Sequence, residues 1–173
     1  MNVAIYGGSF DPVHSGHVET IKKALKSLDI DKLIVIPAFR NPFKTTIHAS
    51  QELRIAWLKR ACKAFKKVEI SSFEIEQNRA TPTIETVKYF EKKYKKIYLI
   101  IGSDNLTNLH KWHQFTRLNS KVTFVVASRE GYLRRHPYIS LDVHKRVSST
   151  ALRSFASQKF LTKEIRDFYA REN

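Results

Sequence analysis

Short runs of continuously apolar residues alternate along this chain with longer segments in which apolar residues recur every three or four positions. The short runs predict β-strands at residues 2–6, 32–36, 68–70, 96–101, 122–126 and 138–141. The longer segments have the spacing of amphipathic helices. Because continuously apolar strands need cover on both faces, the alternation predicts an α/β fold: a doubly wound, Rossmann-like and mostly parallel sheet flanked by helices.

Helix boundaries are marked by apolar spacing and by capping residues. One apolar stripe covers residues 18–28. Ser50 is a candidate N-cap for a helix that reaches about Phe65, and Thr81–Pro82 is typical of the N-cap and first position of another helix. Two further helices are expected to begin near residues 149 and 162.

At 173 residues the chain fits a single domain, residues 1–173, with a sizeable core. Its hydrophobic fraction of 42% is ordinary for a globular protein, and no apolar run approaches the roughly 20 residues that cross a bilayer. The first residues lack the features of a signal peptide, so we expect a cytoplasmic protein with no membrane segment. Cys62, the single cysteine, allows no intrachain disulfide and is expected to fill the core.

Thirty-one lysines and arginines against sixteen acidic residues give a net charge of +15, which attracts polyanions such as ATP, RNA or DNA. Many of the lysines occur in runs that follow helix faces, as at residues 22–26, 63–67 and 92–96, and such runs are usually solvated. A basic nucleic-acid-binding module is therefore kept as an alternative. No basic strand with interleaved aromatic residues favours it.

The loop after the first predicted strand carries the strongest chemical signal. Gly7 and Gly8 end the apolar run, and His14 and His17 flank Gly16 where the next helix should begin. Backbone N–H groups and a helix N-terminus then meet at one point, which forms a cradle for anions, and the imidazoles add further donors. The alternative is a tight turn with one packed and one surface histidine. We favour phosphate binding, since three of the five glycines fall in this short stretch.

Two other loops are expected beside this one. Ligands of doubly wound sheets bind at the carboxyl edge of the strands. The loops that begin at Gly7, Pro37 and Gly102 all follow predicted strands, so the topology places the three of them at that edge.

A second cluster of phosphate-binding residue types lies far along the chain. Three hydroxyl residues stand at a predicted helix start and a guanidinium follows one turn later: Ser148, Ser149, Thr150 and Arg153. An ordinary serine N-cap with a surface arginine would give the same pattern, so this cluster alone does not decide.

Both clusters resemble the signatures of one superfamily. The segment Gly8–His17 is similar to the His-x-Gly-His signature of a nucleotidyltransferase superfamily, and Val147–Arg153 is similar to its Ile-Ser-Ser-Thr-x-Ile-Arg segment. The resemblance implies an α/β enzyme that transfers a nucleotidyl group from a nucleoside triphosphate to a phosphate acceptor, with the second segment holding the triphosphate. Val147 and Leu152 are mild departures.

Further segments resemble the bacterial nicotinate mononucleotide adenylyltransferases of that superfamily. Residues 100–106 followed by Trp112 and His113, and the segment 80–87, carry this likeness. It implies that Asp104 contacts a ribose, that Trp112 stacks on the pyridine ring, and that backbone N–H groups near Thr83 and His113 bind the nicotinate carboxylate. Physically, a carboxylate accepts hydrogen bonds from hydroxyls, and an indole offers a flat surface to a ring.

Two segments depart from the family pattern. Residues 128–132 resemble its Arg-Pro-Gly-Tyr loop near the adenine, with Arg129 retained and Glu130 in place of proline. The segment 37–44 resembles a stretch that ends in Pro-Pro-His-Lys; Lys44 matches, but Phe43 replaces the histidine. A phosphate contact from that histidine is therefore lost, and Arg40 or Arg54 is a candidate to replace it.

The resemblance as a whole implies adenylyl transfer from ATP to nicotinate mononucleotide, giving deamido-NAD and pyrophosphate. The expected catalytic residues are His14, His17, Lys44 and Arg153. The expected ATP-binding residues are Gly7, Gly8, Ser9, Phe10, Gly16, Arg129, Ser148, Ser149 and Thr150. The expected acceptor-binding residues are Thr83, Asp104, Trp112 and His113.

Mg²⁺ is expected on the triphosphate of ATP because of the charge of the phosphates. Few carboxylates lie near these motifs to hold the ion on the protein. Asp11 is the exception, and its alternative role is to fix the loop. A homodimer is compatible with the sequence. Nicotinamide mononucleotide, phosphopantetheine and glycerol-phosphate nucleotidyl transfer are the alternatives within the class, since those enzymes share the first histidine motif.

Overall fold

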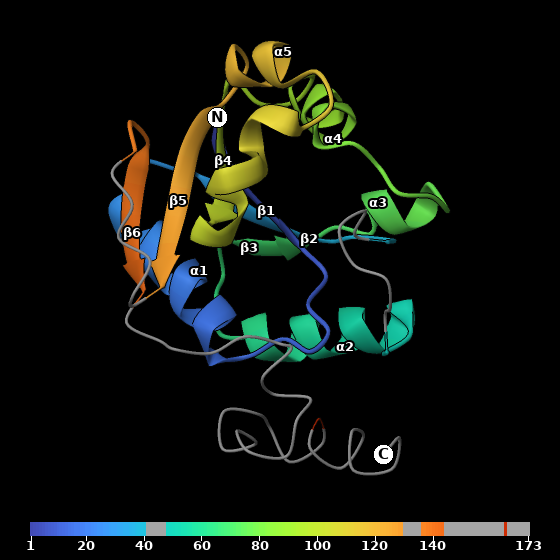
Figure 1. Cartoon of the computed structure of the whole chain (residues 1–173). Helices are drawn as coiled ribbons and strands as arrows, with labels where there is room; N and C mark the ends of the chain where they lie inside the picture. The colour runs from blue at the N-terminus through green and yellow to red at the C-terminus, as the bar shows by residue number, and fades with distance from the viewer. Residues whose placement is uncertain (41–47, 130–135, 144–164, 166–173) are drawn as a thin grey trace.

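A computed structural model describes residues 1–40, 48–129, 136–143 and 165 (Figure 1). Its centre is a six-stranded sheet in the order β3-β2-β1-β4-β5-β6, in which every neighbouring pair is parallel. The strands are β1 (Asn2–Gly8), β2 (Lys32–Pro37), β3 (Val68–Ile70), β4 (Lys96–Gly102), β5 (Thr123–Arg129) and β6 (Ile139–Val143). The order runs outward from β1 in both directions, so the predicted doubly wound, Rossmann-like sheet is confirmed, and its described part is wholly parallel.

Helices cover both faces of this sheet (Figure 1). They are α1 (Ser15–Ser27), α2 (Gln51–Cys62), α3 (Phe73–Glu76), α4 (Thr83–Phe90), the 3₁₀-helix η1 (Ser103–Lys111) and α5 (Phe115–Asn119). Residues of α1 and α2 pack with Ala4 and Tyr6 in one core. Residues of α4, η1 and α5 pack with Val3 and Ile5 in a second core on the opposite face. Successive residues of β1 therefore serve opposite cores, which explains why the strand is apolar throughout.

The structure corrects two predicted helix boundaries and adds three elements. The helix capped by Ser50, whose side chain accepts a hydrogen bond from Leu53 N, ends at Cys62 and not near residue 65. The helix predicted from Thr81–Pro82 has Pro82 as its N-cap and begins one residue later. The elements α3 and α5 were not predicted because four and five residues carry too few turns to show an apolar period. The element η1 was not predicted because a 3₁₀-helix has three residues per turn and does not follow the α-helical period. The helices expected near residues 149 and 162 lie outside the described residues.

The parallel arrangement brings three loops to one edge of the sheet. In the register of the sheet Gly8 pairs with Pro37, and Gly102 ends β4 beside them. The loops that follow β1, β2 and β4 therefore begin at the same edge, as predicted. Cys62 lies in the first core, where burial raises the pKa of its thiol to about 11. Within the described ranges, no helix has both the length and the apolar character to cross a membrane.

Candidate active site

Two histidines cap the helix that follows β1. His14 is the N-cap of α1, and its Nδ1 accepts a hydrogen bond from Gly16 N at 3.2 Å. His17 Nδ1 in turn accepts from His14 N at 3.2 Å, so the two residues form a reciprocal capping box. The histidines therefore satisfy backbone donors that the helix start would otherwise leave open.

This capping fixes which ring nitrogens can donate. A nitrogen that accepts a backbone N–H carries no proton, so in the neutral imidazole the proton lies on Nε2. Both His14 and His17 thus keep an Nε2–H donor. Their rings are stacked with centroids 3.7 Å apart and planes 26° from parallel, so the two donors share one location. The sequence predicts paired imidazole donors at the helix start, and the structure places them there.

Aromatic rings support the pair from the side of β1. The Phe10 ring lies edge-on to His17 at 4.9 Å and edge-on to Tyr6 at 5.5 Å. Phe10 is buried and has φ 48°, in the left-handed region. A small hollow beside these rings is lined by Tyr6, His14, Gly16, His17, Thr20, Gly102, Ala127 and Val143. The hollow joins the histidine pair to the ends of β4, β5 and β6.

The glycines at this edge of the sheet differ in what a side chain would meet. A Cβ on Gly8 would lie 3.1 Å from Phe10 Cζ, so glycine admits the ring. A Cβ on Gly102 would lie 2.3 Å from Asp104 Oδ1, so glycine leaves room for that carboxylate. A Cβ on Gly7 would meet no atom of the described residues within 4 Å. Gly7, a predicted ATP-binding residue, therefore has no steric requirement of its own.

Asp11 fixes the histidine loop to the segment after β2. Its carboxylate is 2% exposed and accepts hydrogen bonds from His48 N at 2.8 Å and Ala49 N at 3.0 Å. The His48 ring lies nearby, with Nδ1 3.5 Å from the carboxylate. The alternative that Asp11 fixes its loop is confirmed.

Arg54 does not fit the expectation that it replaces a phosphate contact. The side chain is fully buried, and Nη1 donates to the carbonyls of Ser9 and Ala38, both at 2.8 Å. Sequence reasoning missed this role, although one signal was present. Arg54 precedes Leu58 by one helical turn and Cys62 by two, so it belongs to the buried stripe of α2. The half-buried Ile55, which the apolar spacing suggests instead, lies beside that stripe.

The predicted acceptor-binding residues come from two neighbouring elements. Asp104 and Trp112 lie at the two ends of η1, and the exposed His113 follows. Thr83 opens α4. The pKa of Glu85 on α4 is lowered, first by its hydrogen bond to Arg79 and to a smaller extent by the charges of Arg79 and His113. Trp112, at the end of η1, packs against the same core cluster as Ile84, the neighbour of Thr83 in α4, so the two elements share one core.

Behind α4 lies a buried carboxyl that sequence reasoning also missed. Glu74 of α3 accepts a hydrogen bond from Thr86 Oγ1 at 2.7 Å. Burial raises the pKa of Glu74, and the bond from Thr86 opposes that effect only in part. This pair ties α3 to the helix that begins with Thr83.

Several predicted residues cannot be placed. Outside the described residues lie Lys44, Ser148, Ser149, Thr150 and Arg153, together with Phe43. Arg129 ends β5 at the carboxyl edge, but its side chain is not described. That the segment 147–153 holds the triphosphate beside the histidine loop therefore stays a prediction.

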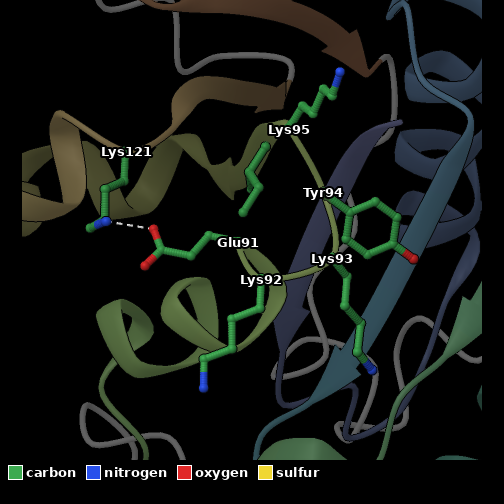
Figure 2. A pocket seen from close by; sticks show the side chains of 7 residues that line it. Glu91, Lys92, Lys93, Tyr94, Lys95 and Lys121 are labelled. Carbon is green, nitrogen blue, oxygen red and sulfur yellow. Dashed lines mark hydrogen bonds and ion pairs between the residues drawn. The ribbon is translucent and has the colours of Figure 1, made fainter.

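A second hollow lies at the opposite end of β4. It has a volume of about 450 Å³ and is lined by Glu91, Lys92, Lys93, Tyr94, Lys95, Ile97 and Lys121. Lys121 and Glu91 form an ion pair across it at 2.5 Å (Figure 2). None of the predicted site residues that the structure describes lines this hollow. In the described ranges, no three histidine, cysteine, aspartate or glutamate side chains gather as a metal site would need.

Comparison with known proteins shows what the chain is similar to. Residues 5–155 match the cytidylyltransferase-like family. A probable nicotinate-nucleotide adenylyltransferase from a Nitratiruptor species is 46% identical over 175 aligned positions, which cover 98% of this chain and 99% of that protein. The corresponding protein of Sulfurimonas denitrificans is also 46% identical, with coverages of 99% and 96%.

A solved structure shares the fold. The nicotinic acid mononucleotide adenylyltransferase of Plasmodium falciparum, complexed with NaAD, superposes with a TM-score of 0.77 at 21% identity and covers 99% of this chain and 96% of its own. The solved structure shows the shared fold, and the family match and the full-length sequence relatives show the family. The chain belongs to the cytidylyltransferase-like family, within the group of nicotinate-nucleotide adenylyltransferases.

Proposed function

We propose that this chain transfers the adenylyl group of ATP to nicotinate mononucleotide, giving nicotinate adenine dinucleotide and pyrophosphate in NAD biosynthesis. The observation that carries the proposal is the capped histidine pair, whose two Nε2–H donors lie together at the N-terminus of α1. A helix N-terminus with converging donors favours phosphate groups. The full-length relatives support the choice of reaction.

The reaction needs no covalent intermediate on the enzyme. An oxygen of the 5′-phosphate of nicotinate mononucleotide attacks the α-phosphorus of ATP. The bond from that phosphorus to the bridging oxygen of the β-phosphate breaks, and pyrophosphate leaves with the electron pair. Catalysis then depends on positioning and on neutralising the charge that gathers on the phosphate oxygens. In this proposal His14 and His17 donate from Nε2 to the α- and more distal phosphates.

The remaining predicted residues take roles around this centre. Lys44, Arg153 and the hydroxyls of residues 148–150 hold the leaving pyrophosphate in the proposal. Gly8 and Phe10 shape the loop that receives the triphosphate. On the acceptor side, Asp104 accepts hydrogen bonds from a ribose, and Trp112 stacks on the pyridine ring. The backbone near Thr83 and His113 binds the carboxylate.

Mg²⁺ enters with ATP as its phosphate complex, since hard divalent cations bind phosphate oxygens. We infer that one domain carries both substrate sites and that the enzyme works in the cytoplasm, where ATP and pyridine nucleotides are available. A homodimer is part of the proposal, and sedimentation equilibrium of the purified chain measures it directly.

Pyrophosphate release tests the function. The purified protein is supplied with MgATP and, in separate reactions, with nicotinate mononucleotide, nicotinamide mononucleotide or phosphopantetheine. We expect release with the nicotinate acceptor at a kcat/KM well above that of the other two. Turnover restricted to the amide would reverse the acceptor assignment. No release with any acceptor, together with strongly salt-dependent binding of RNA or DNA, would favour the nucleic-acid alternative.

A further inference from the structure

Arg54 has no part in the function proposed above, yet its guanidinium lies fully buried between the loops that follow β1 and β2. We propose that Arg54 is a positioning residue for adenylyl transfer: it holds the Ser9–Phe10 peptide so that the Phe10 ring supports the imidazole of His17. The inference rests on the proposed function, since it assigns Arg54 to the step in which His17 acts.

The hydrogen bonds of Arg54 join the two loops at their beginnings. Nη1 donates to Ser9 O and to Ala38 O, both at 2.8 Å. Ala38 N also donates to Gly8 O at 2.9 Å, which holds the same two segments together. A guanidinium stays protonated even when buried, so its removal from water is costly unless oxygen acceptors surround it. The two carbonyls provide such acceptors, and both belong to the edge where the histidine pair lies.

Helix α2 supplies a rigid base for this guanidinium. Arg54 lies in the first turn of the helix, and its N–H donates to Ser50 O at 3.1 Å. Trp57 and Leu58, on the same face of α2, are buried in the core that also contains Ala4 and Tyr6 of β1. The backbone that carries Arg54 is therefore fixed by packing, and the guanidinium can restrain the softer loops above it.

The peptide that Arg54 holds has an unfavourable conformation. Phe10 has φ 48°, in the left-handed region that residues with a Cβ seldom adopt. The Ser9 carbonyl belongs to the peptide plane whose rotation sets this angle. Loss of the bond to Arg54 would let the plane turn toward a negative φ. That rotation would move the Phe10 ring out of its edge-on contact with His17, which is now 4.9 Å between ring centroids.

The proposed chain of effects thus runs from a buried cation to a catalytic ring. Arg54 fixes the Ser9 carbonyl, Phe10 keeps its left-handed φ, and the Phe10 ring holds His17 against His14. The rings of His17 and His14 are stacked at 3.7 Å, so a shift of one disturbs the other. Small displacements of groups that act on a reacting phosphate are costly in rate, by about 100-fold for a shift near 1 Å.

The test compares Arg54→Lys and Arg54→Met with a matched control on the same helix, Lys59→Met, whose side chain is exposed. Steady-state kcat and KM for ATP are measured well below the melting temperature of each variant. We expect kcat to fall about 10- to 100-fold in the Arg54 variants. We expect KM for ATP to change by less than about threefold. Lys59→Met should match the wild type.

A double-mutant cycle separates positioning from general stabilisation. If Arg54 acts through Phe10, Arg54→Lys in a Phe10→Ala background should lower kcat by less than about twofold further. The ring-proton resonances of His17 should also move in Arg54→Lys, because the ring current of Phe10 changes at that imidazole. A role in stability alone would lower the melting temperature of Arg54→Lys. It would leave kcat and the His17 ring-proton resonances unchanged.

Two results would overturn the inference. One is a folded Arg54 variant with the kcat of the wild type. The other is a double variant whose fold-loss in kcat equals the product of the losses in Arg54→Lys and Phe10→Ala, which means that the two residues act independently. Should Arg54→Met fail to fold, Arg54→Lys and the cycle decide. If the wild type releases no pyrophosphate with any acceptor, the proposed function fails, and the His17 resonances in Arg54→Lys still test the structural link.

Discussion

The histidine loop and the acceptor side of the site are built in opposite ways. In the loop, Phe10, Asp11 and His14 are each at most 4% exposed, and every one of them is held by a ring contact or a backbone hydrogen bond. On the acceptor side, Asp104 and His113 are exposed and Trp112 is half-buried at the end of a 3₁₀-helix. One region is packed in place before any ligand binds, and the other is open to solvent.

This contrast matches the demands of the proposed reaction. Charge moves among phosphate oxygens during the transfer, and donors that are already fixed stabilise it without reorganisation. The acceptor must enter and the dinucleotide must leave, so an open surface suits that side. We therefore expect substitutions in the histidine loop to lower kcat and substitutions on the acceptor side to raise the KM for nicotinate mononucleotide.

His17→Ala should have the largest effect. Loss of the Nε2 donor is expected to lower kcat by about 100-fold or more, because a donor to the transition state is removed. His17→Asn is the informative companion, since its side-chain oxygen can accept the N–H of His14 and keep the cap, while its short amide places no donor at the position of Nε2. Both variants should be equally slow, and His17→Asn should be the more stable in urea unfolding. His110→Ala, at an exposed histidine of η1, is the control.

A loss in His17→Ala confined to the KM for ATP would contradict this assignment. It would show that the imidazole binds the ground state and does not stabilise the transfer itself. The comparison between the two regions would then lose its kinetic basis.

Trp112→Ala should have the next largest effect and should act on the acceptor alone. Removal of a stacking surface for the pyridine ring is expected to raise the KM for nicotinate mononucleotide about tenfold. The KM for ATP should stay within error. Trp112→Phe, which keeps a flat ring, should recover most of the affinity. Equal changes in both KM values would mean that Trp112 supports the fold of η1 and not the acceptor.

Gly102→Ala should have a smaller effect on the KM, and it should leave the melting temperature nearly unchanged. The added Cβ would lie 2.3 Å from Asp104 Oδ1, so the carboxylate must turn away. If Asp104 accepts hydrogen bonds from the ribose of the acceptor, the KM for nicotinate mononucleotide should rise about threefold. The melting temperature should change little, because the short side chain of Asp104 can move. Gly7→Ala is the matched control for stability, since a Cβ there meets no atom within 4 Å in the part of the chain that the structure describes.

The smallest predicted effect concerns pH and the support of α4. Burial raises the pKa of Glu74, so above its ordinary pKa of 4.5 the unfolded chain releases a proton that the folded chain keeps. The unfolded state then binds fewer protons, and the free energy of unfolding falls as pH rises through the window between the two pKa values. Glu74→Gln removes this dependence and retains an oxygen for Thr86. Urea unfolding at pH 5 and at pH 8 should show the variant gaining on the wild type at the higher pH. An equal difference at both pH values would refute the linkage.

Much of the scaffold was predictable from the sequence, for a definite reason. Strands such as β1 and β4 are apolar on both faces because each face meets a core, and that pattern is visible without coordinates. The meeting of the loops after Gly8, Pro37 and Gly102 follows from parallel pairing alone. The predicted start of α1 at the histidines is also confirmed, since the residues that cap a helix are adjacent to it in sequence.

The supporting residues of the site were less accessible to sequence reasoning. Arg54 and Glu74 are charged residue types, and a charged residue on a helix suggests solvent unless its burial is known. Their partners, the Ser9 and Ala38 carbonyls and the Thr86 hydroxyl, are backbone or distant groups that no local spacing reveals. The capping by Nδ1 could not be predicted either, because the pattern His-x-Gly-His does not show which ring nitrogen accepts the backbone N–H.

The central claim is that the two capped imidazoles present Nε2 to the triphosphate, and imidazole ¹⁵N NMR of the uniformly labelled protein tests it directly. On titration with a non-hydrolysable ATP analogue, we predict that the Nε2 resonances of His14 and His17 shift and saturate while their Nδ1 resonances, held by backbone N–H groups, stay nearly fixed. A saturating analogue that leaves all four resonances in place would contradict the account.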